Sequence, residues 1–157
     1  FGYCLGGGLE LPLACHFRLA AETGASIGLP ELELGVVPAW GGTARLTRCV
    51  GRDKALDLML RARKIDGPEA LRIGLVHSVH PAGQLKAAAH ALALELAAMP
   101  PLAVAGILRC VVGAGAASLQ DALAEERRAV LRCAGTHDQQ EGFAAFLGKR
   151  KPVFHGG

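Results

Sequence analysis

The feature that most constrains this chain is a run of three glycines, Gly6, Gly7 and Gly8, that opens directly into an apolar helical segment. Glycines let a ligand approach the backbone closely, and the N–H groups at a helix N-terminus favour negative charge. The turn therefore predicts either a site for an oxyanion or phosphate, or tight packing of helix on strand. Because no G-K-[ST] follows, it is not the phosphate loop of a nucleotide-binding protein.

Two carboxylates lie near glycine-rich turns. Glu10 falls on the first turn of the helix that the glycines open, among apolar neighbours that favour a partly dry position. Glu31 follows Pro30 in a segment, residues 29–42, that we expect to be mostly loop. Either residue alone is typical of a solvated surface, but two carboxylates facing one site can perform paired acid–base chemistry on a water molecule.

Composition describes a globular chain with an aliphatic core. Of the 157 residues, 51% are hydrophobic and only 4% aromatic, so Leu, Val, Ile and Ala must fill the interior. The net charge of +3 is too small to indicate nucleic-acid binding. The chain contains no uncharged run of about 18 apolar residues, so we expect no membrane span. The five cysteines form no C-x-x-C motif and indicate reduced, buried thiols in a cytoplasmic protein.

The pattern along the chain predicts two parts. Residues 1–83 alternate short strands, glycine turns and helices, with a capping box at Asp66 and Glu69, whereas residues 84–157 are helical throughout. Ser118 and Thr136 mark two helix starts in the second part. The expected strands are 17–21, 26–28 and 75–79, and the expected helices include 43–48, 52–60, 84–99 and 102–112.

Several segments together resemble the enoyl-CoA hydratase/isomerase (crotonase) family. In the first half these are LGGGLEL at residues 5–11, GLPE at 28–31, LGVVP at 34–38 and GGTARL at 41–46. EALRIGLV at 69–76 and EGFAAFLGKRKPVF at 141–154 continue the match in the same order. The chain is accordingly identified as the carboxy-terminal portion of a crotonase-family protein, entering the fold partway through.

The resemblance implies an α/β fold, a ClpP/crotonase-like spiral of ββα turns followed by carboxy-terminal helices. It makes Glu10 and Glu31 the catalytic pair that holds one water across the C2–C3 double bond of an enoyl-CoA, with the N–H of Gly7 as one oxyanion donor. The second donor belongs to an earlier part of the family's fold, outside this chain. Residues assigned to substrate binding by the same match are Gly6, Gly8, Pro30, Ala39, Trp40, Phe146 and Lys149.

The same resemblance implies an acyl-CoA thioester as the ligand, with no metal and no cofactor beyond the coenzyme A of the substrate. Family members assemble as trimers or as hexamers built from trimers, and the helical region 84–157 would supply subunit and CoA contacts. Phe146 and Lys149 would meet the adenine end of CoA. Neither nucleic acid nor membrane is an expected partner.

This chain departs from the family's usual pattern at three places. His16 stands where many members have Asp, and the spacing from Glu10 to Glu31 is one residue longer than usual. Ala39 and Trp40 occupy the place of Gly and Ala in the common P-G-A-G-G. Because an indole fills far more space than a methyl group, we expect Trp40 to narrow the acyl pocket.

Two alternatives stay open. An isomerase, decarboxylase or thioesterase of the same family would use the same oxyanion hole, and many isomerases keep only the later glutamate. The chain could also be an inactive fragment that lacks half of the oxyanion hole. Finally, His77 and His80 form an H-x-x-H pattern typical of metal pairs, but residues three apart on a strand face opposite sides, so we interpret them as surface histidines.

Overall fold

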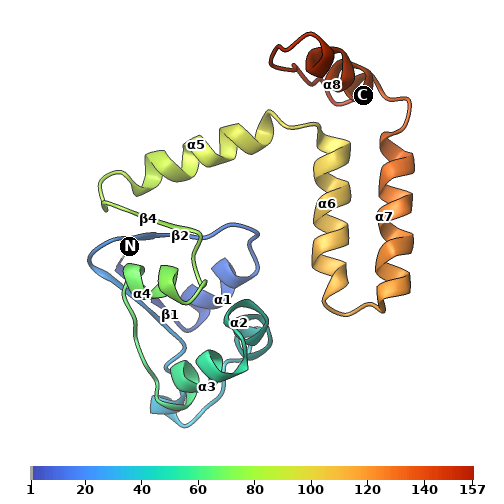
Figure 1. Ribbon diagram of the computed structural model, residues 1–157. Helices are drawn as coiled ribbons and strands as arrows, with labels where there is room; N and C mark the ends of the chain where they lie inside the picture. Colours follow the sequence, from blue (N-terminus) through green and yellow to red (C-terminus); the bar gives the residue numbers. More distant parts are fainter. Residues whose placement is uncertain (1) are drawn as a thin grey trace. The chain divides into compact units, whose positions relative to one another are not determined.

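The computed structural model describes residues 2–157 and divides the chain into two compact units. The first unit is Phe1–His90 and the second is Ala91–Gly157, with the boundary inside helix α5 (Leu85–Ala97). Each unit is described by itself below, and both appear in Figure 1.

The first unit is built on two pairs of parallel strands. Strand β1 (Gly2–Leu5) pairs with β3 (Ala25–Gly28), and β2 (Leu19–Ala21) pairs with β4 (Ser78–His80). Parallel partners need a crossover connection, which between β1 and β3 contains helix α1 (Gly7–Leu13). The crossover brings Leu5 beside Gly28, so the glycine turn that follows β1 lies next to the segment that leads to Glu31.

The other helices of the first unit pack against these strands, against α1 or against one another (Figure 1). They are the 3₁₀ helix η1 (Glu31–Leu34), α2 (Gly42–Val50), α3 (Arg52–Leu60) and α4 (Gly67–Arg72). The core between them is aliphatic, as the composition predicts, and its largest fully buried side chains are Leu29, Leu46 and Leu75. Burying each such side chain stabilises the fold by about 1.5–3 kcal/mol.

Local signals around α4 are partly confirmed. Oδ1 of Asp66 accepts a hydrogen bond from the N–H of Glu69 at 2.8 Å, as the capping box predicts. The Glu69 side chain does not return to Asp66 but pairs with Arg63 at 2.9 Å and Arg72 at 3.2 Å. The strand expected at residues 75–79 begins only at Ser78, because the N–H of Leu75 still bonds back to the carbonyl of Ala70 and closes the helix end.

The second unit is helical, in agreement with the sequence pattern. After α5 come α6 (Pro101–Ala114), α7 (Leu119–Cys133) and α8 (His137–Leu147). Helices α6 and α7 run side by side as a hairpin (Figure 1), and their close approach leaves Gly106 room for no side chain, since a Cβ there would lie 3.1 Å from that of Ala129. Ser118 and Thr136 cap α7 and α8 through their hydroxyl groups, as predicted.

Two expectations about surfaces have mixed outcomes. Within residues 2–157, no single helix is long and apolar enough to cross a membrane, and α5 with α6 meets that test only as a pair bent at the break between them. The cysteines carry free thiols, but the prediction that they are buried is wrong: Cys15 is exposed, and the others are only partly covered because they lie at the edges of the packed elements.

Candidate functional site

The glycine turn between β1 and α1 is built for close approach. Gly6 has φ 55° and ψ −127°, a conformation open essentially to glycine alone, and its carbonyl accepts the N–H groups of Leu9 and Glu10. The N–H groups of Gly7 and Gly8 precede these bonds, and within residues 2–157 no backbone acceptor lies opposite them. They are the unpaired donors that every helix start presents.

Pro12 lies in the second turn of α1, inside the helix, where a proline is normally unfavourable. Having no N–H, it leaves the carbonyl of Gly8 without its usual partner one turn later. The thiol of Cys4 fills this place, with Sγ 3.1 Å from the Gly8 oxygen. Burial raises the pKa of Cys4, which keeps the group a thiol that can donate. The helix therefore tolerates proline because β1 supplies a replacement donor.

Glu10 is buried, as its leucine neighbours predict, with only 4% of its surface exposed. Its Oε1 accepts the backbone N–H groups of Trp40 at 2.9 Å and Gly42 at 2.8 Å. A Cβ on Gly42 would lie 2.8 Å from the same oxygen, so only glycine lets the carboxylate approach this closely. Two amide donors on one oxygen fix the position and orientation of this carboxylate.

Glu31 has a different environment. It is the first residue of η1, directly after Pro30, rather than part of an irregular loop as the sequence analysis expects. Its Oε2 is buried and has no hydrogen-bond partner among the described residues. Its Oε1 lies against the glycine turn, 3.1 Å from the position that a Cβ on Gly6 would occupy. Native proteins rarely leave a buried oxygen unpaired, so this atom points to a water or ligand group.

Trp40 completes the surroundings of the turn. The edge of its indole lies over Gly7, where an added Cβ would come within 2.5 Å of Cζ3. In this chain the side chain is otherwise open, with 75% of its surface exposed. The glycine turn is thus the common neighbour of three groups: the backbone donors of α1, the indole of Trp40 and the carboxylate of Glu31.

Arg45 is a functional candidate that the sequence analysis missed. Its Nη1 donates to the carbonyl oxygen of Trp40 at 2.7 Å, next to the two N–H groups that bind Glu10. The sequence contained one signal for this role. Arg45 lies in the first turn of α2, where the helix dipole disfavours a positive charge unless a specific partner stabilises it.

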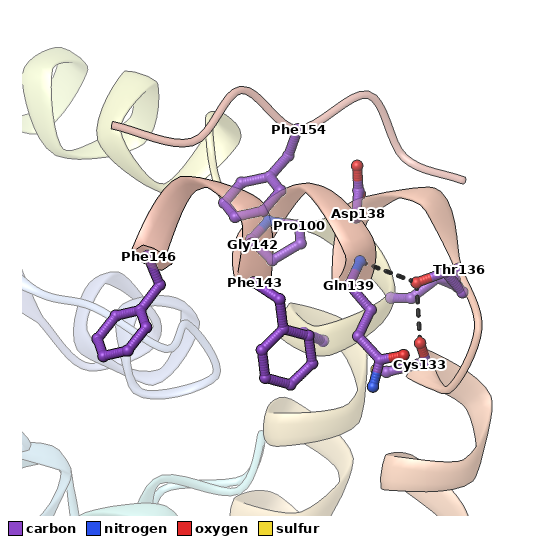
Figure 2. A pocket seen from close by; sticks show the side chains of 11 residues that line it. Pro100, Cys133, Thr136, Asp138, Gln139, Gly142, Phe143, Phe146 and Phe154 are labelled. Atoms are coloured by element: carbon purple, nitrogen blue, oxygen red, sulfur yellow. Dashed lines mark hydrogen bonds between the residues drawn. The ribbon is translucent and has the colours of Figure 1, made fainter. Parts of the chain in front are cut away.

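Phe146 and Lys149, the predicted CoA contacts, lie in the second unit at the end of α8. Phe146 lines an open, largely apolar cavity of about 500 Å³, together with Phe143, Phe154 and Pro100 (Figure 2). Lys149 adopts φ 50°, a left-handed conformation that is uncommon outside glycine. The structure thus provides an aromatic surface around Phe146, whereas Lys149 follows three residues later in the chain and is not among the residues that line the cavity.

Both histidines of the H-x-x-H pattern have a ring nitrogen in contact with another group of the protein. Nδ1 of His77 accepts the N–H of Arg18 at 3.2 Å, and Nε2 of His80 lies 2.9 Å from the hydroxyl of Ser78. Across residues 2–157, no group of three or more metal-ligating side chains comes together.

Known proteins resemble this chain over nearly its whole length. A family model described as enoyl-CoA hydratase/isomerase matches residues 1–157. The chain is 45% identical over 153 residues to a "probable enoyl-CoA hydratase" of Mycobacterium bovis, covering 98% of this chain and 59% of that protein. It is 40% identical over 155 residues to the "2,3-dehydroadipyl-CoA hydratase" of Escherichia coli, covering 99% of this chain and 60% of that protein.

Solved structures confirm the predicted fold class. A crystal structure of enoyl-CoA hydratase from Bacillus anthracis superposes with a TM-score of 0.94 at 39% identity, covering 99% of this chain and 60% of that one. A related structure from Geobacillus kaustophilus gives the same TM-score, identity and coverage. The chain therefore spans about three fifths of the length of the relatives that it matches.

Proposed function

The chain belongs to the enoyl-CoA hydratase/isomerase family, and from this premise we propose that the protein is a hydro-lyase that adds water across the C2–C3 double bond of a 2-enoyl-CoA thioester. The observation that carries the proposal is the pair of carboxylates around the glycine turn. Glu10 is buried and held by two amides. Glu31 has one buried, unpartnered oxygen and places its other carboxylate oxygen against Gly6.

The two glutamates would have separate roles. Glu10, whose Oε1 is held by two N–H groups, is suited to take a proton from the attacking water as its hydroxyl joins C3. Glu31 is suited to deliver the proton that C2 receives. The net change is one water added, and each group returns to its starting state once the two exchange a proton through solvent.

Charge that develops on the thioester oxygen would be stabilised by backbone donors. The N–H of Gly7, at the open start of α1, supplies one of them, flanked by Gly6 and Gly8. Such a donor typically lowers the barrier by about 2.7–4 kcal/mol. The family resemblance places the second donor outside residues 1–157, so the complete hole would need a segment beyond this chain.

The remaining predicted contacts follow from the same proposal. Pro30, Ala39 and Trp40 would border the acyl chain, with the indole edge over Gly7 narrowing the pocket. The aromatic surface at Phe146, together with Lys149, would receive the adenine end of CoA. Coenzyme A would arrive with the substrate, and no separate cofactor is required. We further propose assembly as a trimer or hexamer in the cytoplasm.

An isomerase of the same family is the second candidate, because many isomerases need only the later glutamate, here Glu31. The presence of both carboxylates favours the hydratase. In an isomerase, Glu31→Gln would abolish double-bond migration while Glu10→Gln would be mild.

The test uses this chain alone and joined to the segment of the Mycobacterium bovis relative that the match leaves out. Loss of the conjugated absorbance of a short trans-2-enoyl-CoA, with the 3-hydroxyacyl product identified by chromatography, would support hydration. Full hydration by Glu10→Gln, or migration of the double bond without hydration, would overturn the proposal in favour of the isomerase. Activity only in the joined form would show that the chain alone is an incomplete site.

A further inference from the structure

The turn formed by residues 40–42 is held from two sides. On one side, Oε1 of Glu10 accepts the N–H groups of Trp40 and Gly42, the outer two amides of the turn. On the other side, Nη1 of Arg45 donates to the carbonyl oxygen of Trp40 at 2.7 Å. That carbonyl belongs to the peptide unit between the two amides. Because the peptide unit is planar, the bond from Arg45 to the carbonyl and the bonds from the amides to Glu10 constrain the same segment of backbone.

Arg45 also binds the next carbonyl along the turn. Its backbone N–H donates to the oxygen of Gly41 at 2.9 Å, so a single residue engages two successive carbonyl groups. Gly41 has φ 89°, and a Cβ at that position would lie 2.2 Å from Nη1 of Arg45. Nη1 of the guanidinium therefore occupies the space that a side chain at position 41 would need, so Gly41 must be a glycine both for its backbone conformation and for space.

The position of Arg45 is unfavourable for a positive charge. It is the fourth residue of α2, where the helix dipole presents its positive end. Within residues 2–157 its side chain makes no ion pair, and its one hydrogen bond goes to the Trp40 carbonyl. Arg48, three residues later on the same exposed helix surface, makes no such contact and is a matched reference.

We infer that Arg45 is a positioning residue for the proposed reaction: by fixing the Trp40 carbonyl it orients the two amides that hold Glu10 beside the glycine turn. The inference rests on the proposed function, since it names a support for the carboxylate that acts there. Successive N–H groups in such a turn form a concave site for an anionic oxygen. Arg45 acts on the reaction only through that site and through the indole of Trp40.

Loss of Arg45 should therefore lower kcat by a larger factor than it changes KM for the enoyl-CoA, any change in KM coming from the loosened indole of Trp40. A misplaced catalytic group costs up to about 10²-fold in rate. Arg45→Gln, with a shorter neutral side chain, should show this loss, and Arg45→Lys should recover part of it. Arg48→Gln should match the parent enzyme. In a Glu10→Gln background, Arg45→Gln should cost little more, because residues that act as one unit are not additive.

A spectroscopic measurement decides the inference independently of activity. Trp40 is the single tryptophan of the chain, so steady-state fluorescence anisotropy reports on this turn alone. We expect lower anisotropy in Arg45→Gln, partial recovery in Arg45→Lys and no change in Arg48→Gln, each measured on chains that circular dichroism shows to be folded. Equal anisotropy in all variants, or a loss of kcat that is the same with and without Glu10, would overturn the inference. An inactive parent enzyme would overturn the proposed function and leave the anisotropy to decide Arg45.

Discussion

Asp138 and Glu141 in the second unit have both carboxylate oxygens engaged, whereas Glu10 and Glu31 in the first unit do not. Asp138 accepts the N–H groups of His155 at 2.8 Å and Gly156 at 3.0 Å. Glu141 accepts both terminal nitrogens of Arg150, at 2.6 and 2.7 Å. These bonds fold the last residues of the chain back along α8.

The first unit uses its acids differently. Glu10 is buried like Asp138, but the two amides that it accepts converge on a single oxygen. Glu31 leaves a buried oxygen with no partner among the described residues. Satisfied carboxylates hold a fold together, while an unsatisfied one lowers stability and is retained where it has another use. We therefore expect Asp138 and Glu141 to act in stability, and Glu10 and Glu31 to act in the proposed reaction.

The largest expected effect is on catalysis. Glu31→Gln and Glu10→Gln should each reduce hydration by about 10²–10⁴-fold, the usual contribution of an acid–base group. The double variant should lose less than the product of the two, because one water is held by both. The measurement is kcat/KM for a short enoyl-CoA in the complete enzyme.

The same Glu31→Gln variant should unfold no more easily than the parent chain, since Oε2 has no partner to lose. A clear fall in the free energy of unfolding, with hydration preserved, would reverse the assignment made by the comparison.

The next effect is on stability. Asp138→Ala leaves two partly buried N–H groups without acceptors, which should lower the free energy of unfolding by about 1–3 kcal/mol. Denaturant unfolding followed by far-ultraviolet circular dichroism measures it. The control is Glu95→Ala, an exposed carboxylate in the same unit with no side-chain hydrogen bond among the described residues. If both variants lose the same amount, the terminal segment is not held by Asp138.

A pH dependence should distinguish Glu141 from the acids of the first unit. Its hydrogen bonds from the Arg150 guanidinium and the Val153 N–H lower its pKa from 4.5 to about 2. A depressed pKa means that the contribution to stability is complete above the ordinary value and is lost as pH falls through about 2. In Glu141→Gln this part of the acid dependence should be missing.

The measurement for Glu141 is the melting temperature of parent and variant across the acid range. The gap between them should narrow as the pH drops below 4.5. A gap that stays constant down to pH 2 would show that the carboxylate is not held by Arg150 in solution.

The smallest effect belongs to a carboxylate that is neither catalytic nor enclosed. Glu33 pairs with Lys64 at 2.9 Å, and the two side chains are 51% and 39% exposed. Exposed pairs contribute about 0–1 kcal/mol, so Lys64→Ala should change the free energy of unfolding by no more than that. A larger loss of unfolding free energy in the same denaturant experiment would mean that the exposed ion pair between Glu33 and Lys64 stabilises the first unit more than its exposure predicts.

Much of this protein could be read from local patterns. The caps at Asp66, Ser118 and Thr136 were predictable because each joins a side chain to an N–H three residues away. The glycine turn and the two candidate glutamates were also visible, and their placement in one known family came from motifs that follow one another along the chain. Short contacts of this kind depend on the identity of a few neighbouring residues.

Only the tertiary structure decided how the site is assembled. The bonds from Trp40 and Gly42 to Glu10 span about thirty positions, and the replacement of the Pro12 donor by Cys4 depends on β1 lying beside α1. The contact of Arg45 with the Trp40 carbonyl could not be predicted from the sequence, because it depends on how the turn at residues 40–42 curves around the Glu10 carboxylate. Contacts between distant residues depend on crossovers and packing that no local pattern contains. The sequence by itself therefore determined the helices and strands and the chemical groups that they carry. The fold determined which of those groups meet.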